Sequence, residues 1–95
     1  MANNMASEEA YEEMIAALSQ FESAVSENCA EMQSSAAECA ENMQGDPAAA
    51  KASEVVGKHC NSILAQLEEV DKIIAALQQE IEKIKATAAR SNSFE

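Results

Sequence analysis

Apolar residues in the second half of the chain recur in alternating steps of four and three from residue 56 to residue 88. This heptad seam predicts a long amphipathic helix that packs along one side. Leu64 and Ile73 widen the stripe, as expected for a helix in a bundle that contacts more than one neighbour. The seam consists of Val56, Cys60, Ile63, Leu67, Val70, Ile74, Leu77, Ile81, Ile84 and Ala88.

The first half carries a weaker apolar stripe with a mean step of about 3.6 residues, which predicts a second amphipathic helix. Its middle is rich in alanine and serine, which let another backbone come close but bury little apolar surface. This helix therefore depends on packing against another element. The stripe consists of Leu18, Phe21, Val25, Cys29, Met32, Ala36, Cys39 and Met43, with Tyr11, Met14 and Ile15 at its N-terminal end.

A short segment between the two stripes has the residues of a helix–helix turn. Gly45 suits the left-handed residue that ends a helix, Asp46 suits an N-cap, and Pro47 suits the first helical position. Met43 is expected to keep an apolar side chain packed near the turn, in the manner of an apolar plug. Because so short a connection makes its two helices antiparallel, the segment predicts a hairpin.

The predicted fold is all-α, an antiparallel two-helix hairpin that completes a four-helix bundle with a partner. We expect a single domain over residues 1–95, with helices at about 7–43 and 48–90, a turn at 44–47 and a tail at 91–95. Ser7 is the expected cap of the first helix.

A partner is expected because two helices packed only on each other bury one stripe apiece, which is little core for a 95-residue chain. A homodimer would double the net charge of −11, so self-repulsion favours a less acidic or basic helical partner, with the homodimer as the alternative. The expected partner-binding residues are Leu18, Phe21, Val25, Met32, Val56, Ile63, Leu67, Val70, Ile74, Leu77, Ile81 and Ile84.

Charge is divided unevenly along the chain. Residues 1–45 contain nine glutamates and no lysine or arginine, whereas residues 46–95 contain eight acids and six bases. Without clustered cations we expect no binding to nucleic acid, and without a long apolar run we expect no membrane insertion. The glutamates of the first half either form a docking surface for a basic partner or are a solvated face.

Little in the sequence points to catalysis or metal binding. Cys29, Cys39 and Cys60 lack the spacing of a zinc site or a disulfide framework, so we expect each to be a small buried or half-buried hydrophobe, with a Cys29–Cys60 disulfide as the alternative. His59 is the only histidine and points roughly 100° away from Cys60 on a helix. We therefore predict no catalytic residue, no cofactor and no metal site.

Two long helices joined near mid-chain by Met43-Gln44-Gly45 resemble the WXG family of type VII secretion substrates, with Met43 in place of the tryptophan. The alanine-rich segment 48–52 is similar to the start of the family's second helix. The family's C-terminal export motif, a tyrosine followed by an acid, is missing, because no tyrosine follows Tyr11.

The missing motif leaves two interpretations, that the chain is not exported by this route or that a partner supplies the signal. The second resembles the small helical partner proteins of LXG-type toxins. The resemblance implies an adaptor, chaperone or co-secreted partner that binds the helical N-terminal region of such a toxin. A self-associating coiled-coil subunit or a homodimeric WXG-like protein is the alternative. We expect a bacterial cytoplasmic protein, or one exported without a cleavable signal peptide, since residues 1–9 lack a basic and an apolar region.

Overall fold

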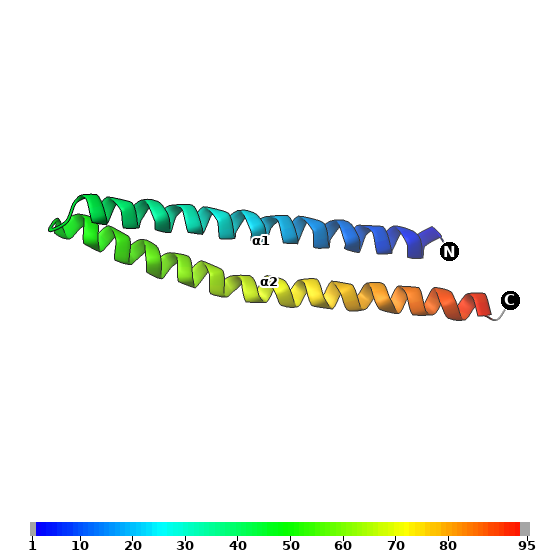
Figure 1. Cartoon of the computed structure of the whole chain (residues 1–95). Helices are drawn as coiled ribbons and strands as arrows, with labels where there is room; N and C mark the ends of the chain where they lie inside the picture. Colours follow the sequence, from blue (N-terminus) through cyan, green and yellow to red (C-terminus); the bar gives the residue numbers. More distant parts are fainter. Residues whose placement is uncertain (1, 94–95) are drawn as a thin grey trace. The chain divides into compact units, whose positions relative to one another are not determined.

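The structure of the chain is a computed structural model that describes residues 2–93, and the side chains of residues 7–90. It contains two helices, α1 over Ala2–Asn42 and α2 over Pro47–Ser93 (Figure 1). No strand is present between residues 2 and 93. The predicted all-α fold, with two long helices joined by a short turn, is confirmed.

The N-terminal end of α1 differs from the prediction. The helix begins at Ala2, so Ser7 lies inside it and the predicted cap at Ser7 is wrong. Alanine and methionine, both good helix formers, are frequent before Ser7, and no proline or glycine interrupts them. A serine near the start of an apolar stripe is therefore not enough to locate the first turn.

The C-terminal end of α2 also lies beyond the predicted bound. The helix runs to Ser93, so the predicted tail is wrong for residues 91–93, and residues 94–95 lie outside the described part of the chain. Arg90 lies in the last turn, where a positive charge is favourable beside the free carbonyl groups of the helix end.

The turn has the local conformations that its residues predict. Gly45 has a φ of +87°, in the left-handed region, and α2 begins at Pro47. The Oδ1 atom of Asp46 accepts hydrogen bonds from the backbone N–H groups of Ala48 at 2.8 Å and Ala49 at 3.4 Å, so Asp46 caps α2. Met43 is half exposed, so its predicted role as an apolar plug is wrong.

Alanine substitution at the two glycines should change stability in opposite directions. A Cβ would meet no atom within 4 Å at either Gly45 or Gly57, so steric room does not distinguish them. Gly45→Ala should lower the free energy of unfolding by about 1 kcal/mol because φ is positive there, whereas Gly57→Ala in α2 should raise it by about 0.5–1 kcal/mol. Urea unfolding followed by circular dichroism measures both, and a shift of the same sign for both would contradict this account.

The chain divides into two compact units, and each contains a segment of both helices. Unit 1 combines α1 up to Phe21 with α2 from Glu69 onward, and unit 2 comprises residues 22–68 with the turn. Within each unit the two helix segments are antiparallel (Figure 1). The single domain over residues 1–95 stays a prediction.

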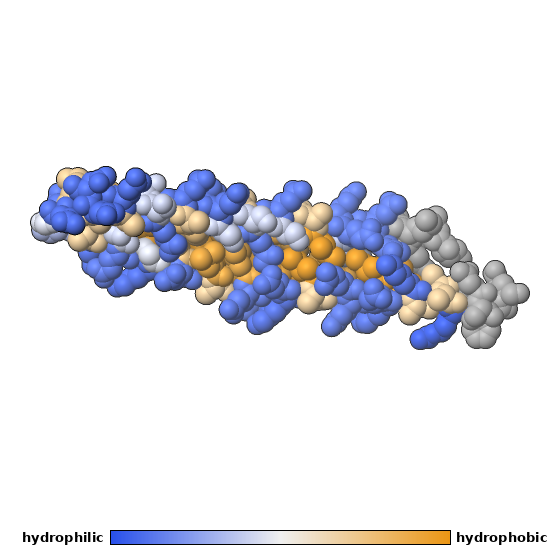
Figure 2. Space-filling model, in the orientation of Figure 1, coloured by the Kyte–Doolittle hydropathy of each residue, from blue (hydrophilic) through white to orange (hydrophobic). Residues whose placement is uncertain are grey.

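Few apolar residues of the described chain are buried. In unit 1 Ile81 is buried, and in unit 2 Cys29, Ala49 and Cys60 are buried. The remaining residues between the two helix segments are only half-buried, because each helix has a single neighbour to cover it. Figure 2 shows apolar side chains along the line between the helices and hydrophilic side chains along the outer edges.

An ion pair joins the two helix segments of unit 1. Nζ of Lys85 on α2 lies 3.8 Å from Oε1 of Glu8 on α1. Both side chains are partly exposed, so the pair contributes on the order of 0–1 kcal/mol. Packing at the seam, rather than charge, holds this unit together.

Candidate partner-binding surface

Most of the residues predicted to bind a partner lie between the chain's own helices. Nine of the twelve are buried or half-buried within the hairpin, and the structure places them along the seam of unit 1 or of unit 2. These nine are Leu18, Val25, Val56, Leu67, Val70, Ile74, Leu77, Ile81 and Ile84. They hold α1 against α2, and whether a partner also touches them stays a prediction.

The other three predicted residues are exposed. Phe21 and Met32 lie on α1 and Ile63 lies on α2, where the adjacent Leu64 is half-buried in its place. Four further large apolar side chains among the described residues are exposed as well. They are Met14, Met43, Val55 and Ile73. The apolar surface of each helix is thus wider than its neighbour covers.

In unit 2 three of the four large exposed apolar residues directly precede half-buried residues of the seam. Met32, with 48% of its surface exposed, precedes Gln33, and Val55, with 39% exposed, precedes Val56. In an antiparallel helix pair, positions just before the seam residues of both helices lie on the same side of the pair. Cys39 and Ile63 occupy equivalent positions. We call Met32, Cys39, Val55 and Ile63 the unit 2 flank.

Unit 1 has a flank of the same kind. Met14 directly precedes Ile15 on the seam, and Phe21 follows Met14 by seven residues, which is about two helical turns and therefore the same face. Ile73 precedes Ile74 on α2. Sequence periodicity had placed Phe21 in the apolar stripe but could not distinguish the covered side of that stripe from the exposed side.

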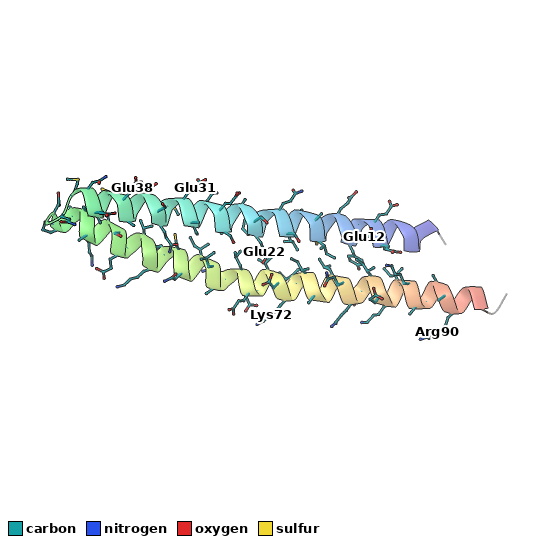
Figure 3. The ribbon with its side chains drawn as sticks, viewed as in Figure 1. Glu12, Glu22, Glu31, Glu38, Lys72 and Arg90 are labelled. Carbon is teal, nitrogen blue, oxygen red and sulfur yellow. The ribbon has the colours of Figure 1, made fainter. Side chains whose placement is uncertain are left out.

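A shallow open groove lies in unit 2. Asn28, Glu31, Met32 and Ser35 of α1 line it together with Val56 of α2, and the surface of the groove is mainly apolar. Figure 3 shows Glu31 and Glu38 on the side of α1 away from α2. The sequence indicated neither Asn28 nor Ser35, because polar residues beside an apolar stripe give no periodic signal. Glu31 is one of the first-half glutamates for which a docking surface was one of the two expected roles.

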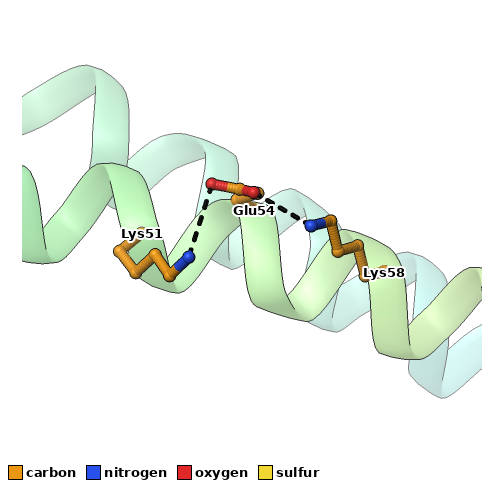
Figure 4. A network of polar contacts seen from close by, with 3 residues as sticks. All are labelled: Lys51, Glu54 and Lys58. Carbon is orange, nitrogen blue, oxygen red and sulfur yellow. Dashed lines mark ion pairs between the residues drawn. The ribbon is translucent and has the colours of Figure 1, made fainter.

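The charges of unit 2 are strongly unbalanced. Residues 22–68 contain eight acids and two lysines, a net charge of −6. Both lysines lie on α2 and pair with Glu54, Lys58 at 3.1 Å and Lys51 at 3.9 Å (Figure 4). The α1 segment of unit 2 contains no base. Its surface therefore presents negative charge beside the groove.

Two cysteines meet at the seam of unit 2. Cys60 has no exposed surface, Cys29 is 2% exposed, and the S–H of Cys60 donates a weak hydrogen bond to the carbonyl oxygen of Cys29 at 3.7 Å. Burial raises the pKa of the Cys60 thiol, and the contact with Cys29 raises this pKa further. Both cysteines are small buried hydrophobes as predicted, whereas Cys39 is exposed, so that prediction is wrong for Cys39. All three are free thiols.

Thiol labelling should separate Cys39 from the other two cysteines. The thiolate is the reactive form, so a buried thiol with a raised pKa reacts slowly, and an exposed thiol reacts fast. We expect Ellman's reagent to modify one thiol per folded chain quickly and all three in denaturant. Cys39→Ala should abolish the fast phase. Fast modification of two or three thiols in the folded chain would show that the seam opens at Cys29 and Cys60.

The described residues contain no arrangement typical of a metal or membrane-spanning site. Among residues 7–90 no three His, Cys, Asp or Glu side chains cluster closely enough to hold a metal ion. His59 is exposed whereas its neighbour Cys60 is buried, so the two do not converge. Neither helix, over its described length, has an apolar stretch that could cross a bilayer.

No protein-family model, curated protein or solved structure matches this chain.

Proposed function

We propose that this chain is a non-enzymatic, WXG-like adaptor or chaperone of type VII secretion, or a co-secreted partner, that binds the helical region of an effector toxin. It acts in the bacterial cytoplasm or is exported with its partner. The turn at Gly45 and the two long helices support the likeness to the partner proteins of LXG-type toxins.

The observation that carries the proposal is the exposed apolar flank beside the seam of each unit. Phe21 is 54% exposed and Ile73 is 49% exposed, whereas only four apolar residues of the described chain are buried. Apolar surface that large helices leave uncovered is typical of a protein-binding site. A helical partner packed on a flank would bury this surface and complete a four-helix bundle.

Co-expression with the products of the neighbouring genes, followed by size-exclusion chromatography with light scattering, tests this proposal. We expect a stable 1:1 complex with the helical N-terminal region of a large effector. A homodimer or larger assembly that captures none of these candidates would overturn the proposal in favour of a self-associating coiled-coil subunit.

A matched pair of variants tests which surface binds the partner. Met32→Glu places a charge on the unit 2 flank, whereas Ser34→Glu places the same charge on exposed α1 surface roughly 200° around the helix. We expect Met32→Glu to weaken the complex at least about tenfold and Ser34→Glu to leave it nearly unchanged. Equal effects would exclude the flank as the binding surface.

A further inference from the structure

The groove of unit 2 has walls of different chemistry. Met32 and Val56 are the apolar residues of its lining, and Asn28 and Ser35 are short polar residues on the α1 side. Short side chains let a third helix approach α1 closely, and an open groove between two helices suits the convex apolar stripe of such a helix. The shape therefore fits an amphipathic helix better than a small molecule, which needs an enclosed cavity.

Charge distinguishes the two edges of this groove. On the α1 side Glu31 lines the groove at its outer edge, away from α2, and Glu38 lies seven residues further on, on the same face of α1 but outside the groove lining. No described lysine or arginine of unit 2 pairs with either carboxylate. Along α2, Glu54 already binds Lys51 and Lys58 within the helix (Figure 4). The unneutralised charge is therefore negative and lies on the α1 edge.

We infer that the unit 2 groove takes an amphipathic helix of another protein, with lysine or arginine beside its apolar stripe on the edge that faces Glu31 and Glu38. The inference rests on the proposed partner-binding function and specifies the partner's chemistry. A cation placed there gains attraction from carboxylates without losing an existing pair, whereas a glutamate-flanked helix meets repulsion.

A second copy of this chain fits the groove less well. Its α1 segment would bring further glutamates and no base, and each copy of unit 2 adds a net charge of −6. Its Lys51 and Lys58 would have to leave Glu54 to pair with the groove. A basic helix of another protein adds no negative charge and breaks no existing lysine–glutamate pair.

Two synthetic peptides of about 20 residues, long enough to span the α1 segment of unit 2, test the inference. Both have the same leucine stripe, one flanked by lysine and the other by glutamate. Fluorescence anisotropy with the full chain should show binding of the lysine peptide at least about tenfold tighter than that of the glutamate peptide, and weakening with salt. Equal affinities, or binding of neither peptide, would overturn the inference.

Three variants show whether the lysine peptide uses the groove. Met32→Glu adds an acid to the groove and removes an apolar side chain from it. If charge alone held the lysine peptide, this variant would bind it more tightly. We expect the loss of packing to dominate, so that the affinity for the lysine peptide falls about fivefold or more. Glu31→Gln should weaken binding about two- to fivefold. Glu68→Gln removes the same charge from the opposite side of α2 and should have little effect. Unchanged or tighter binding by Met32→Glu would overturn the groove as the site.

The peptide experiment and the co-expression experiment together distinguish a failure of this inference from a failure of the proposed function. If a neighbouring gene product is captured but the two peptides bind equally, the partner-binding function stands and the requirement for a basic flank fails. If light scattering shows a homodimer of the chain that Met32→Glu dissociates, a second copy occupies the groove and the inference is overturned.

Discussion

Ile81→Ala should lower the free energy of unfolding by about 2–4 kcal/mol, because it removes most of a side chain that is only 6% exposed and leaves a cavity at the seam of unit 1. A loss of this size is a large fraction of the stability of a small domain. The melting temperature should fall by roughly 10–20 °C.

Ile73→Ala is the matched control for that variant, since it removes the same atoms from the same helix and the same unit. Ile73 is half exposed, so the free energy of unfolding should fall by less than about 1 kcal/mol. Thermal unfolding followed by circular dichroism measures both variants. Equal losses for the two isoleucines would mean that Ile81 is not the better covered of the two in the free chain.

Cys60→Asp should lower the free energy of unfolding by at least about 3 kcal/mol at neutral pH. The substitution places a carboxylate where Cys60 has no exposed surface and where its contact is the carbonyl oxygen of Cys29, which can only accept a hydrogen bond. In urea unfolding of this variant we expect a midpoint at a much lower urea concentration than for the unchanged chain, or no folded baseline at all.

The pH dependence of this variant checks the cause. Burial raises the folded-state pKa of a carboxyl above its unfolded value, so the loss is largest above the folded pKa and shrinks as pH falls through it. The protonated carboxyl can also donate to the Cys29 carbonyl oxygen. Cys39→Asp places the same group on exposed surface and should cost less than about 1 kcal/mol at any pH. A Cys60→Asp variant that stays equally unstable at low pH would point to steric rather than electrostatic disruption.

The turn could be predicted from the sequence because its chemistry is local. A positive φ favours glycine, a cap needs a short side chain with an acceptor, and proline fits the first helical position, so Gly45, Asp46 and Pro47 indicate their own conformations. The structure agrees at all three. The N-terminal end of α1 and the C-terminal end of α2 lack such signals, and there the predicted bounds differ from the structure by several residues.

Which apolar residues face the chain's own helix could not be predicted from periodicity. The apolar stripe of α1 includes both Val25, which is half-buried, and Met32, which is exposed, while the polar Gln33 takes the half-buried position beside it. Stripes of about 3.5 and 3.6 residues per turn differ by only about 20° per heptad, so a wide stripe is compatible with several contact lines. The middle of α1 offers alanine and serine rather than large residues, so nothing in its sequence fixes one line.

The exclusive placement of lysine in α2 has a consequence for modification of the chain. Every lysine lies between Lys51 and Lys85. Lysine acetylation and amine-reactive crosslinkers can therefore modify side chains of α2 but none of α1. Acetylation at Lys85 would remove the cation that joins α2 to Glu8 of α1, and acetylation at Lys58 would free Glu54 from its closer partner. Each such modification makes the chain more anionic, so lysine acetylation would strengthen the preference for a cationic helix.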